Sequence, residues 1–220
     1  EGSRRRMAPR AVGSAILTLL TMAAARATGG GWRSTRQPSR PVLRTTPLCM
    51  LANRPPAPAE NTIVAPDGSQ LLVTYATSSG AVEAWLSQHA QAGFLGFDTE
   101  TKPVFEKTAR PRPPATVQLC SEGSCLVAQL TQLKCVPAAL YEVLEDRDII
   151  MAGVAVDDDA IELWQYWGLE TNCRLELAHV TSGSQPKSLA ALTSQILGVR
   201  LPKSKTLTLS NWEAPLGERE

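Results

Sequence analysis

Two short and almost wholly apolar runs, residues 94–97 and 149–156, each lead directly into acidic residues. Gly93 precedes the first run, and runs of this length and composition predict buried β-strands. The other predicted strands and helices form a meander of strands, followed by strands that alternate with helices. This order predicts an α/β or α+β fold with a mixed sheet and helices on its faces.

Turn residues and helix-capping signals set the bounds of the other elements. Further strands are predicted at 71–75, 115–120 and 125–130, with Gly123 in the hairpin turn that joins the last two. One helix is predicted to begin at Ser78 or Ser79 and to end near Ala90. The other predicted helices are 136–144, 158–167 and 188–197, and a glycine ends each of the last two.

The first acidic group is Asp98 and Glu100, which follow the run 94–97. Residues i and i+2 of a strand point to the same side, so both carboxylates project together. Two adjacent carboxylates repel each other unless a cation lies between them. Mg²⁺ fits such a pair because it prefers oxygen ligands and leaves room for the phosphate oxygens of a substrate. The alternative is a solvated strand end with no ligand.

The second acidic group is Asp157, Asp158 and Asp159, where the second apolar run meets a predicted helix. Acids at a helix N-terminus are stabilised by the helix dipole and by unpaired backbone N–H groups. Helix capping would therefore explain Asp157 or Asp158. It does not explain why all three residues are acidic, which leaves a functional role open.

Taken in order, these motifs resemble those of the DEDD-superfamily 3′–5′ exonucleases, in the branch of ribonuclease D and the Werner-syndrome helicase. Residues 96–100 with Lys102, Pro103 and Phe105 are similar to the first motif of that branch, and residues 114–120 are similar to the strand that follows it. Residues 153–163 resemble the second motif, in which the last acid of the cluster, here Asp159, binds metal. The resemblance covers about residues 71–216.

The resemblance implies a ribonuclease H-like mixed sheet and metal-dependent hydrolysis of phosphodiester bonds from the 3′ ends of nucleic acid, DNA or RNA. It implies Mg²⁺ or Mn²⁺ as cofactor, with two ions in the complete site. Asp98 would bridge both ions, Glu100 would hold the ion that activates water, and Asp159 would bind the second ion.

The third motif of this family is a Tyr or His with an Asp four residues later. The resemblance places it shortly after Leu216, beyond the segment that contains Ser210, Asn211 and Trp212. The sequence ends at Glu220, so we expect a C-terminally truncated domain that lacks this motif.

Three interpretations of the missing motif remain open. The chain is part of an active exonuclease whose third motif lies downstream. Alternatively, it is a catalytically impaired nucleic-acid-binding or scaffold domain. The last possibilities are a nuclease completed by another chain and an unrelated α/β domain. His179 stands where relatives often carry Asp, and we expect a structural role for it.

The N-terminal region differs from the rest of the chain in charge. Ten Arg and one acid, Glu1, precede Glu60, which leaves 12 basic and 20 acidic residues from Glu60 onward. An apolar run at 11–25 followed by an acid-free, Arg-rich stretch is typical of import signals. We therefore expect residues 1–60 to be a disordered signal or transit segment for a plastid or mitochondrion, and residues 70–220 to form the exonuclease domain. A basic tail with no targeting role and a membrane anchor are the alternatives, although we expect no stable membrane association.

The five cysteines have no CxxC spacing and no nearby histidine pair, which argues against a zinc site. Their odd number and scattered positions predict free thiols. No basic stripe marks a path for long DNA. The loop after Glu100 carries Lys102, Lys107, Arg110 and Arg112, which either contact phosphate or are solvated.

Overall fold

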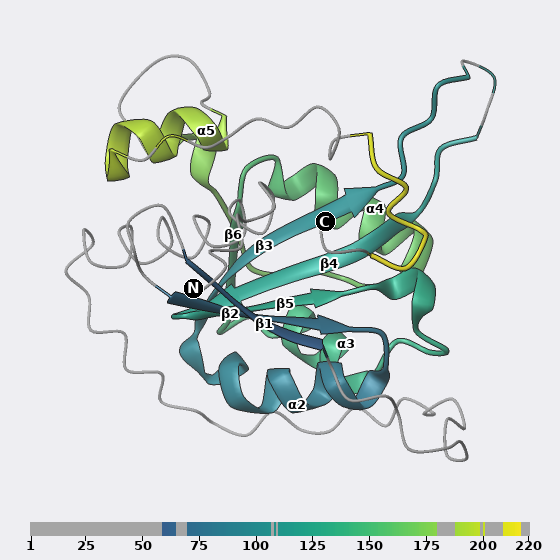
Figure 1. The fold of residues 1–220 in the computed structure, drawn as a ribbon, viewed down its shortest axis with the longest axis horizontal. Helices are drawn as coiled ribbons and strands as arrows, with labels where there is room; N and C mark the ends of the chain where they lie inside the picture. The colour runs from purple at the N-terminus through teal and green to yellow at the C-terminus, as the bar shows by residue number, and fades with distance from the viewer. Residues whose placement is uncertain are drawn as a thin grey trace, which may run out of the picture.

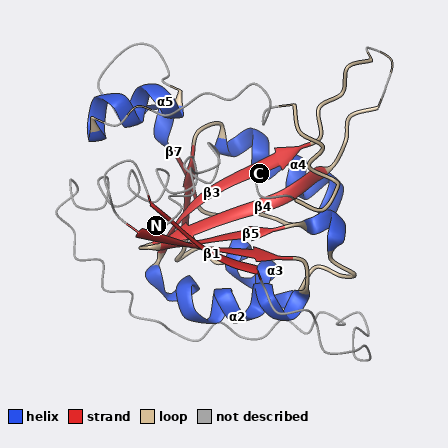
Figure 2. Ribbon diagram, viewed as in Figure 1, coloured by secondary structure: helices blue, strands red, loops and turns tan. Residues whose placement is uncertain are grey.

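The computed structural model describes residues 59–64, 70–106, 108, 110–179, 188–198, 200 and 209–216. The predicted N-terminal signal lies outside these residues except for Ala59 and Glu60. Seven strands form one sheet in the order β1-β2-β5-β4-β3-β6-β7. Figure 2 draws the strands in red and the helices in blue. The strands are β1 Ala59–Val64, β2 Gln70–Ala76, β3 Phe94–Thr101, β4 Pro114–Ser121, β5 Ser124–Ala128, β6 Ile150–Gly153 and β7 Arg174–Glu176.

The sheet is mixed, as predicted. The β3–β4, β4–β5 and β1–β2 pairs are antiparallel, whereas β2–β5, β3–β6 and β6–β7 are parallel. The two outer strands were not predicted from the sequence. β1 precedes the expected start of the domain at residue 70, and β7 is only three residues long.

The helices lie on both faces of this sheet (Figure 1). They are α2 Ser79–His89, α3 Ala138–Glu145, α4 Val156–Trp167 and α5 Leu189–Leu192, which continues into the π-helical turn η4 Thr193–Leu197. Three short 3₁₀ turns, η1 Ala90–Ala92, η2 Leu130–Gln132 and η3 Leu177–His179, join elements. In the described part of the chain, no helix is both long and apolar enough to cross a membrane.

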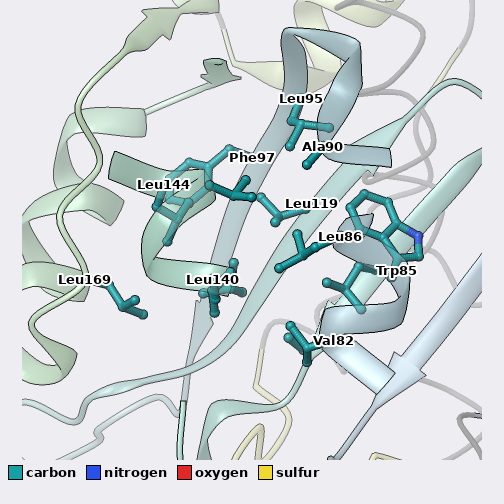
Figure 3. Close-up of a cluster of buried hydrophobic side chains, with 14 of the residues drawn as sticks. Val82, Trp85, Leu86, Ala90, Leu95, Phe97, Leu119, Leu140, Leu144 and Leu169 are labelled. Carbon is teal, nitrogen blue, oxygen red and sulfur yellow. The ribbon is translucent and has the colours of Figure 1, made fainter. Parts of the chain in front are cut away.

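The main core lies between the sheet and the helices α2, α3 and α4. Leu95 and Phe97 of β3 contribute to it together with Leu86 of α2 and Leu144 of α3 (Figure 3). Val156 and Leu163 of α4 belong to the same cluster. A smaller cluster on the opposite face joins Phe94 of β3 to η3 and α5. Strand β3 is therefore covered on both faces, as its apolar sequence predicted.

The expectation of free thiols is wrong for three cysteines, Cys120, Cys125 and Cys135, each of which takes part in a disulfide. Cys120 and Cys125 are paired residues of the β4–β5 hairpin, with Cα atoms 4.2 Å apart, and they form a disulfide. The short turn between the strands brings the two side chains together on one face of the sheet, which spacing along the sequence did not reveal. Cys173 is a free thiol.

Candidate active site at the end of β3

Strand β3 carries the first acidic pair at its C-terminal end. Phe97 and Thr99 are buried, with 1% and 8% of their surfaces exposed, whereas Asp98 and Glu100 are only half-buried. This alternation agrees with the predicted projection of both carboxylates from one side of the strand. One oxygen of Asp98, Oδ1, accepts a hydrogen bond of 3.0 Å from the backbone N–H of Thr99.

The second acidic group lies on α4, which begins earlier than predicted. Strand β6 ends at Gly153, and Ala155 adopts a left-handed conformation with φ of 62°, so the chain turns sharply into α4 at Val156. The strand predicted over the apolar run 149–156 is thus too long at its C-terminal end. All three aspartates of the second group lie in the first turn of the helix.

Gly153 allows this turn to approach β3 closely. A Cβ atom at Gly153 would lie 2.5 Å from the carbonyl oxygen of Phe97. This distance is too short for any residue other than glycine at this position. The last residue pair between β3 and β6 is Gly96 with Ala152. The part of β3 that carries Asp98 and Glu100 therefore extends past the end of β6. The first turn of α4 lies beside this extension.

No aspartate of the second group caps α4. The N-cap position is Ala155, whose side chain accepts no hydrogen bond, and the backbone N–H of Val156 donates to Oε2 of Glu176 at 3.1 Å. Asp157 instead pairs with Arg174, with 2.6 Å between Oδ1 and Nε. The capping interpretation of the aspartates is therefore wrong, although all three still gain from the helix dipole.

Asp159 is the aspartate that faces β3. Its Oδ1 accepts a hydrogen bond of 2.6 Å from Oγ1 of Thr99, so the two motifs are in direct contact. Burial raises the pKa of Asp159 to about 7, and the neighbouring Asp98 carboxylate is the second cause. The hydrogen bond from Thr99 opposes this rise in pKa. Asp98 and Asp159 are thus close enough for their charges to interact.

The donor set fits a divalent metal ion in its chemistry. Carboxylate oxygens are the ligands that Mg²⁺ and Mn²⁺ prefer, and a cation would relieve the repulsion between Asp98 and Asp159. The described residues contain no group of three or more His, Cys, Asp or Glu that is already arranged around a metal position. The structure brings Asp98 and Asp159 together and places Glu100 on the same strand end.

Comparison with known proteins shows to which family this site belongs. Residues 73–219 match the family model of the 3′–5′ exonuclease domain. The chain belongs to the 3′–5′ exonuclease family. The resemblance of its motifs to those of the exonucleases is therefore confirmed.

Similar proteins include longer exonucleases. The chain is 37% identical over 133 residues to exonuclease 3′–5′ domain-containing protein 2 of Drosophila melanogaster, a match that covers 59% of this chain and 22% of that protein. It is 31% identical over 123 residues to the bifunctional 3′–5′ exonuclease/ATP-dependent helicase WRN of Mus musculus, with 54% and 9% covered. The chain thus spans less than a quarter of either relative.

The fold agrees with a solved exonuclease structure. The exonuclease domain of Nibbler from Aedes aegypti matches with a TM-score of 0.55 and 20% identity, over 66% of this chain and 77% of that one. The likeness supports the predicted ribonuclease H-like mixed sheet flanked by helices.

In this exonuclease domain, sequence reasoning missed how residues 209–216 are held. Trp212 is buried, with 2% of its surface exposed, and the fully buried side chain of Gln129 donates from Nε2 to the carbonyl oxygens of Trp212 at 2.9 Å and Ala214 at 2.5 Å. The hydroxyl of Tyr75 donates to Oε1 of Gln129 and accepts from the backbone N–H of Leu216 at 3.2 Å. We call this set of contacts the C-terminal clamp. The one sequence feature that could have indicated these contacts is the polar residue Gln129 directly after the apolar strand β5.

The same segment engages two of the basic residues that follow β3. Glu213 forms a two-pronged ion pair with Arg112, and its Oε2 lies 3.6 Å from Nζ of Lys102. The structure therefore assigns Lys102 and Arg112 an intramolecular anionic partner. Of the other two basic residues of the loop, Arg110 is exposed and Lys107 lies outside the described residues.

His179 is exposed at the end of η3.

Proposed function

We propose that this exonuclease domain hydrolyses phosphodiester bonds at the 3′ ends of DNA or RNA with the help of Mg²⁺ or Mn²⁺. The proposal rests on one observation above all. Asp159 of α4 is held against β3 by Thr99, and burial together with the charge of the nearby Asp98 raises the pKa of Asp159 to about 7. Such a pair of carboxylates is costly for a fold and is characteristic of a cation site.

Asp98, Glu100 and Asp159 would hold the divalent ions, two in the complete site. Ions bound there supply activation of water and neutralisation of phosphate charge. The protein supplies the positions. Strand β3 holds Asp98 and Glu100 rigidly because the neighbouring residues Phe97 and Thr99 are buried, and α4 presents Asp159 from its first turn. The Tyr or His and the last Asp of the third motif would complete the site beyond residue 216.

The proposal is tested with 5′-labelled single-stranded DNA and RNA oligonucleotides, and with Mn²⁺ binding measured in parallel by electron paramagnetic resonance. We expect Mn²⁺ binding that Asp98→Asn weakens strongly, and a ladder of products shortened from the 3′ end that a chelator abolishes. The matched control is Asp158→Asn, which removes an exposed carboxylate of the same cluster.

Two results would contradict parts of this proposal. If Asp98→Asn binds Mn²⁺ as tightly as the unsubstituted chain does, the assignment of the metal site to Asp98 is wrong. Mn²⁺ binding that depends on Asp98 without any shortening of either oligonucleotide would overturn hydrolysis by this chain, and would favour the nucleic-acid-binding alternative.

We also propose that residues 1–60 direct import into a plastid or mitochondrion. Ten Arg against a single acid before Glu60, together with the apolar run at 11–25, support this proposal. A fusion of residues 1–60 to a fluorescent protein should enter an organelle, and a uniformly cytosolic signal would contradict the proposal.

A further inference from the structure

Thr99 lies between the two acids of the first motif, yet its side chain serves the second motif. Its hydroxyl donates to Oδ1 of Asp159 at 2.6 Å, across 60 residues of sequence. Thr99 is 8% exposed, and Asp159 is half-buried, so the contact is shielded from water. A short hydrogen bond from a neutral donor to a carboxylate in such surroundings is stronger than an exposed one.

The backbone arrangement makes this contact possible. Strand alternation turns Thr99 away from Asp98 and Glu100 and toward the first turn of α4, which lies beside the end of β3. Thr101 is the next residue on that side, and its Oγ1 reaches Oε2 of Glu162 at 3.4 Å. Two threonines of β3 thus contact two acids that lie one turn apart on α4. Only the first contact involves a carboxylate of the proposed metal site.

We propose that Thr99 is a positioning residue for metal binding: its hydroxyl fixes Oδ1 of Asp159 and leaves the second carboxylate oxygen for a divalent cation beside Asp98. This inference rests on the proposed function, because it needs a cation at Asp98 and Asp159. A carboxylate that ligates a metal is commonly held by a hydrogen bond from behind, and loss of such a bond weakens metal affinity about 10–100-fold. Thr99 provides that bond from the strand that also carries Asp98 and Glu100.

A purely structural role would predict something different. If Thr99 only docked α4 onto β3, then Thr99 and Thr101 would be equivalent, and their loss would affect stability and not metal affinity. Threonine and valine have nearly the same shape, so Thr99→Val removes the hydroxyl with little change in volume. Thr99→Ser keeps the hydroxyl and removes the methyl group.

The experiment measures the Mn²⁺ dissociation constant by electron paramagnetic resonance for the full chain and for Thr99→Val, Thr99→Ser and Thr101→Val. We expect Thr99→Val to weaken binding about tenfold or more, Thr99→Ser to restore most of the affinity, and Thr101→Val to bind as the unsubstituted chain does. Circular dichroism confirms the fold of each variant. If Thr99→Val fails to fold, Thr99→Ala and Thr99→Ser provide the same comparison.

The outcomes separate this inference from the function on which it rests. If the unsubstituted chain binds Mn²⁺ and Asp98→Asn abolishes binding, but Thr99→Val binds normally, the role of Thr99 is wrong and the metal site stands. Equal loss in Thr99→Val and Thr101→Val also overturns the role of Thr99. If the unsubstituted chain binds no Mn²⁺, both proposals fail together. In an Asp159→Asn background, Thr99→Val should cause no further loss, since the two residues act through one contact.

Discussion

The carboxylate of Glu176 accepts hydrogen bonds from the backbone N–H groups of Val156 at 3.1 Å and of Ala178 at 2.8 Å. One side chain of β7 therefore caps the helix that carries Asp159 and also holds the turn that follows β7. Because Ala155 provides no side-chain cap, the N-terminus of α4 depends on this residue from a distant part of the sequence.

Glu176→Ala should lower the free energy of unfolding by about 1–2 kcal/mol, the usual cost of removing a helix cap. Glu176→Gln keeps an acceptor oxygen and should cost less. Urea unfolding followed by circular dichroism measures both, with Glu170→Ala, an exposed residue, as the control. An unchanged midpoint for Glu176→Ala would show that α4 needs no cap.

The stability of the metal-free protein should fall as pH rises. Asp159 has a pKa of about 7 in the folded protein, against 3.8 for an aspartate in its ordinary surroundings. Between these values the folded state binds more protons than the unfolded state, so the free energy of unfolding decreases from about pH 4 to pH 7, by a few kcal/mol. The asparagine of Asp159→Asn cannot ionise, so the free energy of unfolding of this variant should not fall over that pH range. The variant should therefore be more stable than the unsubstituted protein at pH 8. Urea unfolding at several pH values with a chelator present measures the effect.

The matched control for this pH experiment is Asp158→Asn, which removes an exposed charge one residue away and should retain most of the slope. Identical slopes for Asp159→Asn and the unsubstituted protein would show that Asp159 titrates normally.

Gln129→Ala should release the C-terminal clamp. It leaves the carbonyl groups of Trp212 and Ala214 and the hydroxyl of Tyr75 without their partner, at a cost on the order of 2–3 kcal/mol. Hydrogen exchange should rise at the backbone N–H of Leu216. Gln132→Ala, which removes an exposed contact to the carbonyl of Glu213, should have a much smaller effect. Equal effects of the two variants would contradict a central role for Gln129.

Gly153→Ala should destabilise the domain by more than about 2 kcal/mol, because the added Cβ would lie 2.5 Å from the carbonyl oxygen of Phe97. The backbone of the strand cannot move away without displacing Asp98, so Mn²⁺ affinity should fall as well. Gly123→Ala provides the comparison: it meets no atom within 4 Å, and its cost of about 1 kcal/mol comes only from the left-handed φ of +70°. A stable Gly153→Ala variant would contradict the tight approach of β6 to β3.

The sequence predicted those features that depend on local patterns. The apolar runs, the capping serine Ser78 and the glycines Gly168 and Gly198 placed most elements to within a few residues. The alternation in β3 placed Asp98 and Glu100 on one side. Features that depend on pairing between strands were missed: β1 and β7 are the two edge strands, which pair with β2 and β6, and the disulfide depends on the register of β4 and β5.

The acidic cluster shows the same limit. Residue patterns placed three aspartates at the start of a helix, and the resemblance selected Asp159. Which of the three faces β3 depends on where the helix begins, and the left-handed conformation of Ala155 decides that. An alanine at such a position has no recognisable signal in one sequence, since left-handed conformations usually occur at glycine or asparagine.

The C-terminal clamp also sets an order in time for the folding of this domain. The N–H of Leu216 meets the hydroxyl of Tyr75 across 141 residues of chain, and Gln129 reaches Trp212 across 83. During synthesis, β2 and β5 leave the ribosome before residues 209–216 do. Until then, Tyr75 and Gln129 lack the hydrogen bonds that they form with this segment. Contacts so distant in sequence form late and slowly. The nascent domain therefore gains the stability that the clamp contributes only after residue 216 has left the ribosome.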